Sequence, residues 1–120
     1  MEKYWEGLIV FLSCKDLNAT HHFYSDVLGL PLYLDQGKCR IYQIPGGGML
    51  GFCSHIPFIS SEKSPILTLL TPRVDEVYDL FLSEGIQPEH EPRENPTFHI
   101  YHFFVKDPNG YWVEIQKFLN

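Results

Sequence analysis

The amino-acid sequence predicts an α+β fold made of two consecutive βαβββ modules whose sheets pair around a shared cleft. Strand and helix signals alternate in the same order in both halves of the chain. Aligning Gly29-Leu30 with Gly85-Ile86 offsets the halves by nearly half of the 120-residue length, which indicates an internal duplication. Aromatic residues make up 15% of the chain, a proportion that favours strands and can line an apolar pocket.

Module one is expected at about residues 7–55. It begins with a strand at Leu8–Cys14, a continuous apolar run typical of a strand that is covered on both faces. Asp16 can cap a helix that ends near Leu28 and is closed by Gly29. Three short strands then follow, around residues 32–34, 39–44 and 49–53, separated by turn signals at 36–37 and 45–48.

Module two is expected at about residues 65–118, after a loop. A strand at Ile66–Leu70 precedes a helix that starts after Thr71-Pro72, carries an apolar stripe from Val74 to Phe81, and ends at Gly85. Further strands are expected at residues 86–90, 98–105 and 111–118, the last two joined by the Asp-Pro-Asn-Gly turn at 107–110.

Length and charge limit the function classes. The chain is too short for two independent cores, so residues 1–120 form a single domain. The formal charge is −6 and the basic residues are scattered singly, so nucleic acid is not an expected partner. The longest apolar run, Leu8–Leu12, is far shorter than the roughly 20 residues of a membrane span, and the N-terminal sequence lacks signal-peptide order. We therefore expect a cytoplasmic protein with no membrane partner.

The cysteine pattern favours reduced thiols. Cys14, Cys39 and Cys53 are an odd number and show no C-x-x-C spacing. Such a pattern is more typical of buried thiols inside a cell than of a disulfide framework. We therefore expect all three cysteines to be reduced.

Two segments resemble a known family. Residues 15–32, KDLNATHHFYSDVLGLPL, resemble the first-helix signature of the vicinal oxygen chelate superfamily, and residues 103–118, FFVKDPNGYWVEIQKF, resemble its closing hairpin. This superfamily includes glyoxalase I, bleomycin resistance proteins, extradiol dioxygenases and fosfomycin resistance enzymes. The resemblance covers nearly the whole chain. It implies two modules that curl a mixed sheet into a half-open cup, usually packed against a second chain, and therefore a homodimer.

The resemblance also implies where a metal ion would bind. In the metal-dependent members, His or Glu side chains on the first strand of each module and a Glu on the last strand hold a divalent ion. The last-strand position falls on Glu114, but the first-strand positions fall on Ile9 and near Ile66, and a fourth falls near Gly51. A lone carboxylate cannot hold a divalent ion tightly, so we expect no metal cofactor.

Strand alternation, combined with the family pattern, predicts an aromatic and mainly apolar cup. Its polar groups are Glu114 and His102, which gives it the general make-up of a small-molecule site. The residues expected to line it are Ile9, Phe11, Phe52 (or Cys53), Phe104, Trp112 and Glu114. Glu114 is a candidate general base, residual metal ligand or partner for a cation, or else a structural carboxylate paired inside the cup. His102 forms an acid–base pair with it if their register allows, and is otherwise a core histidine bonded to a carbonyl.

The leading functional hypothesis is binding of a small organic molecule in this cup, of the resistance or sequestration type. The competing hypothesis is an enzyme, a glyoxalase-like lyase, an isomerase or a dioxygenase. It would use Zn, Ni, Mn or Fe in an altered site built from Glu114, His102 and His55, with Glu114 and His102 as catalytic residues. A third hypothesis is a structural or regulatory dimer whose cup is filled.

Overall fold

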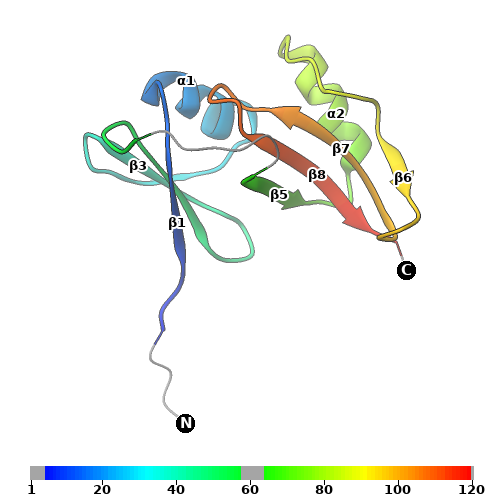
Figure 1. The fold of residues 1–120 in the computed structure, drawn as a ribbon, viewed down its shortest axis with the longest axis horizontal. Coiled ribbons are helices and arrows are strands. Elements are labelled where there is room, and N and C mark those ends of the chain that lie inside the picture. Colours follow the sequence, from blue (N-terminus) through cyan, green and yellow to red (C-terminus); the bar gives the residue numbers. More distant parts are fainter. Residues whose placement is uncertain (1–4, 58–63, 120) are drawn as a thin grey trace. The chain divides into compact units, whose positions relative to one another are not determined.

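The computed structural model of the chain describes residues 5–57 and 64–119, and each of these two segments belongs to a compact unit of its own (Figure 1). The first unit contains β1 (Ile9–Ser13), α1 (Leu17–His21), the π-helix η1 (His22–Val27), β2 (Leu32–Asp35), β3 (Cys39–Gln43) and β4 (Met49–Cys53). The second unit contains β5 (Ile66–Leu70), α2 (Val74–Ser83), β6 (Arg93–Asn95), β7 (Ile100–Lys106) and β8 (Trp112–Phe118). No helix within the described ranges is long and apolar enough to cross a membrane.

The two units have the same topology, which confirms the predicted pair of βαβββ modules. Each has a four-stranded sheet, in the orders β1-β4-β3-β2 and β5-β8-β7-β6. The first and last strands of each unit are parallel and the other pairs are antiparallel. Gly29 and Gly85 follow the helical segments at φ +76° and +73°, the left-handed conformation that ends helices and that glycine adopts without strain.

Three details of the predicted elements are wrong. Residues 86–90 form no strand, and the short β6 comes later, pairing Arg93 with His102 and Asn95 with Ile100. Pro88 lacks the N–H that a ladder needs, and the backbone N–H of Glu89 instead donates to the Phe104 carbonyl at 2.9 Å. The first helix changes to π geometry at its sixth residue.

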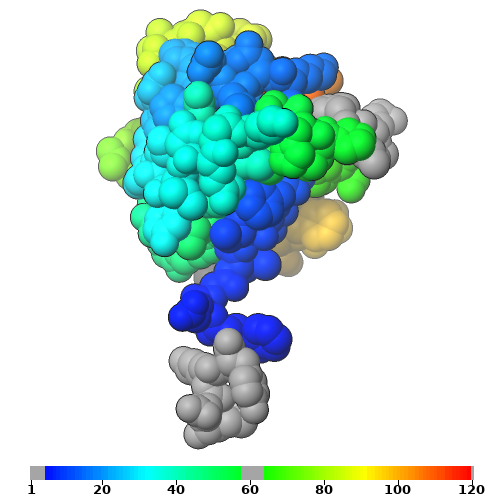
Figure 2. All heavy atoms as spheres, turned by 90° about the vertical axis from the view of Figure 1, so that its left-hand side faces the viewer, coloured from blue at the N-terminus to red at the C-terminus, as the bar shows by residue number. Residues whose placement is uncertain are grey.

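The third difference concerns β1. The sequence predicts a strand covered on both faces, but Ile9, Val10 and Phe11 expose 37%, 43% and 45% of their surfaces. In Figure 2 the blue residues that precede and form β1 are visible at the surface. β1 is an edge strand with β4 as its partner, so an apolar run alone does not show that both faces are buried.

Aromatic side chains form the core of the first unit between its helical segment and its sheet. Phe52 is fully buried, with its ring centroid 4.6 Å from that of Tyr24 and 6.4 Å from that of Tyr42. The Tyr42 hydroxyl lies 2.9 Å from His21 Nδ1. These contacts bury one face of the sheet, while β1 and β4 direct Phe11 and Gly51 to the other.

The second unit buries one face of its sheet under α2 (Figure 1). Phe103 of β7 is fully buried and makes edge contacts with Tyr78 and Phe81 of α2, with ring centroids 5.3 Å and 6.0 Å away. Because successive side chains alternate along a strand, His102 and Phe104 point to the opposite face. That face holds the candidate site.

The expectation of three reduced cysteines is wrong for two of them. Cys39 and Cys53 form a disulfide, whereas Cys14 is buried and takes no part in it. The two bonded cysteines are direct register partners on β3 and β4, with their Cα atoms 4.1 Å apart. Counting cysteines misses this because the pairing depends on the register of the hairpin, which brings together residues 14 apart in sequence.

We expect reduction of this disulfide to lower the free energy of unfolding by about 3 kcal/mol, since the bond closes a short loop and restricts the unfolded chain. Urea denaturation with and without a phosphine reductant, both in the presence of a chelator, measures the difference. A Cys39→Ser/Cys53→Ser variant is the control. If the reductant also destabilised that variant, the effect would come from elsewhere.

Tyr42 gives the first unit a dependence on alkaline pH. Burial raises the pKa of Tyr42, an effect that the neighbouring Arg40 partly opposes. A raised pKa means that the folded state holds the phenol proton more tightly than the unfolded state. The resulting stability is fully present below the unfolded pKa of about 10 and is lost as the pH rises through the folded pKa.

We therefore expect the free energy of unfolding of the wild-type protein to fall between about pH 9 and pH 11 more steeply than that of Tyr42→Phe. Urea denaturation at several pH values provides both slopes. The variant also loses the contact with His21 and starts from a lower stability, so the slopes are compared and not the absolute values. Equal slopes would contradict the assignment to Tyr42.

Candidate functional site

The turn between β7 and β8 sets the positions of the site residues. The Asp107 carboxylate accepts hydrogen bonds from the backbone N–H groups of Asn109 and Tyr111, both at 2.8 Å, and Gly110 has φ +88°. The turn starts an antiparallel register in which Phe104 is opposite Glu114. Because a strand has a side-chain period of two, the alternate residues of both strands then share one face.

Glu114 lies at the centre of this face, on a strand hydrogen-bonded to both neighbours. Thr68 of β5 is its register partner, and the Thr68 hydroxyl donates to Oε1 at 2.8 Å. His102 Nδ1 lies 2.7 Å from Oε2. The Gln116 amide nitrogen lies 3.0 Å from Oε2 and 3.2 Å from Oε1 when the amide is oriented toward the carboxylate. Both carboxylate oxygens therefore have hydrogen-bond partners.

The carboxylate and the histidine are buried at the base of an open pocket. Glu114 is 9% exposed and His102 is 6% exposed, so neither is in bulk solvent. The pocket has a volume of about 490 Å³, within the range of small-molecule sites. Its lining residues are Ile66, Asn95, Phe98, Ile100, His102, Phe104, Glu114, Gln116 and Phe118. Apart from the His102–Glu114 pair and two amides, the lining is aliphatic and aromatic.

Several of the residues expected to line the cup are brought together here, and others are not. His102, Phe104 and Glu114 line the pocket. Trp112 is not among the lining residues but packs edge-on against Phe104, with ring centroids 5.4 Å apart. Thr68 and Phe98 are members of this region that sequence reasoning missed. The residue spacing along β5 carried a signal for Thr68, because it lies on the same face as Ile66.

The remaining predicted residues belong to the first unit. Ile9 and Phe11 lie on the exposed strand β1. Phe52 packs against Tyr24 under the helical segment. The prediction that Phe52 lies on the open face is therefore wrong, because the residues next to it on β4 point to that face. His55 lies beside Cys39, with Nδ1 3.8 Å from the Cys39 sulfur.

In the described part of the first unit, the strands β1 and β4 carry no counterpart of the Thr68–Glu114 pair. The matching register pair on β1 and β4 is Phe11 and Gly51. The Phe11 ring lies directly over Gly51, where a Cβ atom would be 2.5 Å from the ring. The space that a carboxylate side chain would need in this unit is thus taken by an aromatic ring.

A family model confirms the resemblance. The model of the Glyoxalase/Bleomycin resistance protein/Dioxygenase superfamily matches residues 8–115. The chain belongs to this superfamily. No curated protein matches the sequence.

Solved structures share the fold. A lactoylglutathione lyase from Agrobacterium tumefaciens is 24% identical, with a TM-score of 0.75 over 92% of this chain and 91% of that chain. A virulence protein from Salmonella typhimurium is 23% identical, with a TM-score of 0.72 over 99% of this chain and 100% of that chain. A glyoxalase/bleomycin resistance protein/dioxygenase from Alicyclobacillus acidocaldarius is 17% identical, with a TM-score of 0.77 over 100% and 96%. At these identities the likeness shows a common fold, and the chemistry must be argued from the pocket.

The residues around Glu114 do not fit the divalent metal ion that the superfamily implies. The ligand positions on the first strands carry the hydrocarbon side chains of Ile9 and Ile66. Within the described part of the second unit, no third His, Cys, Asp or Glu joins Glu114 and His102 to form a ligand group. One carboxylate and one imidazole provide too few ligands for a tightly held divalent ion.

We expect Thr68→Val to lower the free energy of unfolding by about 1 kcal/mol, because it removes a hydroxyl that donates to a carboxylate at a partly exposed position. Urea denaturation measures the loss. The same substitution in a Glu114→Gln background should cost clearly less. An equal loss in both backgrounds would show that Thr68 does not act through Glu114.

Proposed function

We propose that the protein binds a small organic molecule in the Glu114 pocket, as a resistance or sequestration protein does, and does so without the metal ion of other superfamily members. The observation that carries this proposal is a buried carboxylate at the base of an open, largely apolar pocket of about 490 Å³. A hollow of this kind offers apolar surface for affinity and a few polar groups for orientation.

The lining indicates the chemical class of the ligand. Phe98, Phe104 and Phe118 offer flat apolar surfaces suited to an aromatic or alicyclic ring. Glu114 favours a cationic or hydrogen-bond-donating group over an anion, and the net charge of −6 acts in the same direction. We infer a ligand with an apolar ring system and an amine or similar donor group.

A second candidate function is proton-transfer catalysis in the same pocket. It is favoured by the 2.7 Å contact between His102 and Glu114, which is the arrangement of an acid–base pair. In the metal-dependent version of this hypothesis the protein is a lyase, isomerase or dioxygenase. This version requires that the wild-type protein binds a metal ion and that Glu114→Gln loses it. Elemental analysis after incubation with Zn, Ni, Mn or Fe(II) distinguishes this version from metal-free binding. The homodimer and the cytoplasmic location stay predictions.

We expect Glu114→Gln to weaken the binding of an aromatic amine about tenfold or more while the fold is retained. A charge-assisted hydrogen bond contributes about 1.5–3 kcal/mol, and 1.4 kcal/mol corresponds to a factor of ten in affinity. A panel of ring-bearing amines, each with a matched carboxylate of the same shape, is screened by thermal shift. The hits are then measured by calorimetry.

The control is Glu84→Gln, which removes an exposed carboxylate just after α2 and should leave affinity unchanged. Amines should bind and the matched carboxylates should not. Preference for the carboxylates, or unchanged affinity in Glu114→Gln, would remove Glu114 from the binding site. No binding by any member of the panel would contradict the proposed ligand class.

A further inference from the structure

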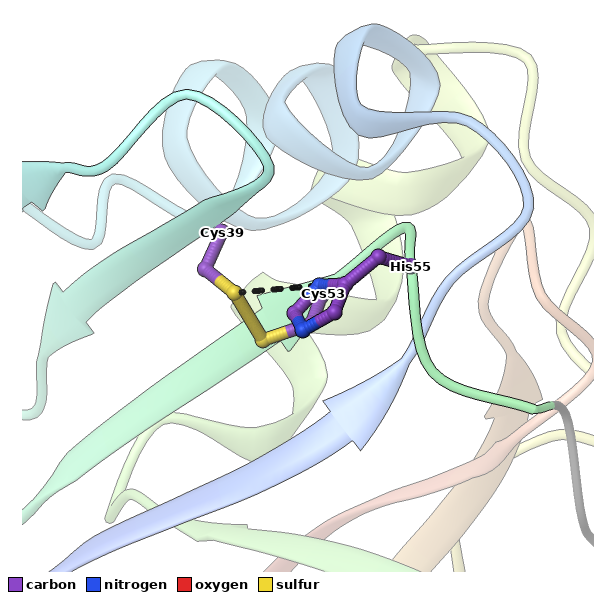
Figure 3. Close-up of side chains that lie close together, drawn as sticks. All are labelled: Cys39, Cys53 and His55. Carbon is purple, nitrogen blue, oxygen red and sulfur yellow. Dashed lines mark hydrogen bonds between the residues drawn. A yellow bond between two sulfur atoms is a disulfide. The ribbon is translucent and has the colours of Figure 1, made fainter.

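The open end of the β3–β4 hairpin, opposite its turn, brings three residues of metal-ligating type together (Figure 3). This cluster lies outside the Glu114 pocket. Cys39 and Cys53 form the last register pair of the hairpin, and His55 follows two residues later. Their candidate ligand atoms all lie within 4.8 Å of one another. Among the described residues, no other group of three or more His, Cys, Asp or Glu side chains has its ligand atoms this close together.

The backbone holds both cysteines in place independently of the sulfur–sulfur bond. The Cys39 carbonyl accepts a hydrogen bond from the N–H of Gln36 at 2.8 Å, and the Cys53 carbonyl accepts one from the N–H of Cys14 at 3.0 Å. β3 and β4 are also paired along their whole lengths. The two thiols of the reduced protein therefore stay opposite each other, which is the preorganisation that a ligand pair requires.

At this open end of the hairpin the two cysteines are buried and the histidine is exposed, an arrangement that suits an ion entering from solvent. Cys39 and Cys53 are 8% and 4% exposed, so their sulfurs lie in a largely water-free position that strengthens electrostatic interactions. His55 is exposed, and its imidazole lies beside the two sulfurs (Figure 3). An ion can reach the sulfurs past a side chain that is itself a ligand.

The spacing agrees with a tetrahedral zinc ion. Zn–S bonds of about 2.3 Å and Zn–N bonds of about 2.0 Å place a sulfur and a nitrogen ligand about 3.5 Å apart, and two sulfurs about 3.8 Å apart. His55 Nδ1 lies 3.8 Å from the Cys39 sulfur, already near the first value. The sulfurs reach the second value only when the disulfide is broken, so disulfide and metal exclude each other.

We propose that the reduced hairpin end is a binding site for a thiophilic divalent ion such as Zn²⁺, with two thiolates and His55 Nδ1 as ligands, and that disulfide formation closes it. Reduction by a dithiol transfers two electrons and two protons to the Cys39–Cys53 bond, giving two thiols and an oxidised reductant. The ion then binds as both thiols release their protons to solvent. In reverse, a small-molecule disulfide and two protons regenerate the protein disulfide, free the ion and leave two small thiols.

Such a site has a fourth coordination position open to water. Two thiolates and one imidazole are borderline-soft ligands that suit zinc better than Mg²⁺ or Ca²⁺, which prefer oxygen. None of the three residues belongs to the Glu114 pocket. Ligand binding there and metal binding here can therefore be removed separately.

Elemental analysis of the full chain tests the proposal. The protein is reduced with a phosphine, freed of reductant without oxygen, incubated with Zn²⁺ and desalted. We expect about one ion per chain in the reduced protein and close to none in the oxidised protein. Co²⁺ in place of Zn²⁺ should show the near-ultraviolet absorption of cobalt–thiolate bonds. Equal metal content in the reduced and oxidised proteins would overturn the proposal.

Matched variants assign the ligands. His55→Gln changes an exposed side chain and should lose the ion, as should Cys39→Ser/Cys53→Ser, with circular dichroism to check folding. The controls are Cys14→Ser, His22→Gln and Glu114→Gln, which should all keep the ion. Retention by Cys39→Ser/Cys53→Ser would show that the ion binds elsewhere, and loss in Glu114→Gln would assign it to the superfamily position.

Discussion

The hydrogen-bond register of β8 between β5 and β7 is the constraint on which the candidate site depends. It places Glu114 opposite Thr68 on one side and opposite Phe104 on the other, with His102 one step along the same face. A slip of one residue would turn the carboxylate toward α2, into the face that buries Phe103. The Asp107 turn, with its two backbone hydrogen bonds, protects against that slip.

Internal duplication lets one topology serve two purposes. Both units share strand order and both helical segments are followed by a left-handed glycine, yet the central register pair is Thr68–Glu114 in one and Phe11–Gly51 in the other. Backbone hydrogen bonds specify the sheet and leave the outward side chains free to change. A polar face can therefore evolve in one unit while its counterpart becomes apolar.

Cross-strand pairing also explains the position of the Cys39–Cys53 disulfide and of His55 beside it. Cys39 and Cys53 meet because β3 and β4 pair in register to the end of their hairpin, and His55 follows just beyond it. In both units, therefore, a central pair of each candidate site, Cys39 with Cys53 and His102 with Glu114, comes from adjacent strands of a hairpin. Adjacent strands place side chains within contact distance without help from distant segments, so sites of this kind need little supporting structure.

The sequence by itself determined the repeated strand and helix order, the glycine-ended helices and the turn at Asp107, because these depend on local periodicity and turn chemistry. Strand alternation together with the family resemblance also predicted Glu114 and His102 on one face, and the β7–β8 register brings them there. Only the tertiary structure decided that Cys39 bonds Cys53 and that Thr68, 46 residues away, donates to Glu114. Strand register and the choice of buried face arise from pairing between strands, whether these are neighbours in a hairpin or distant segments, and local composition carries little record of that pairing.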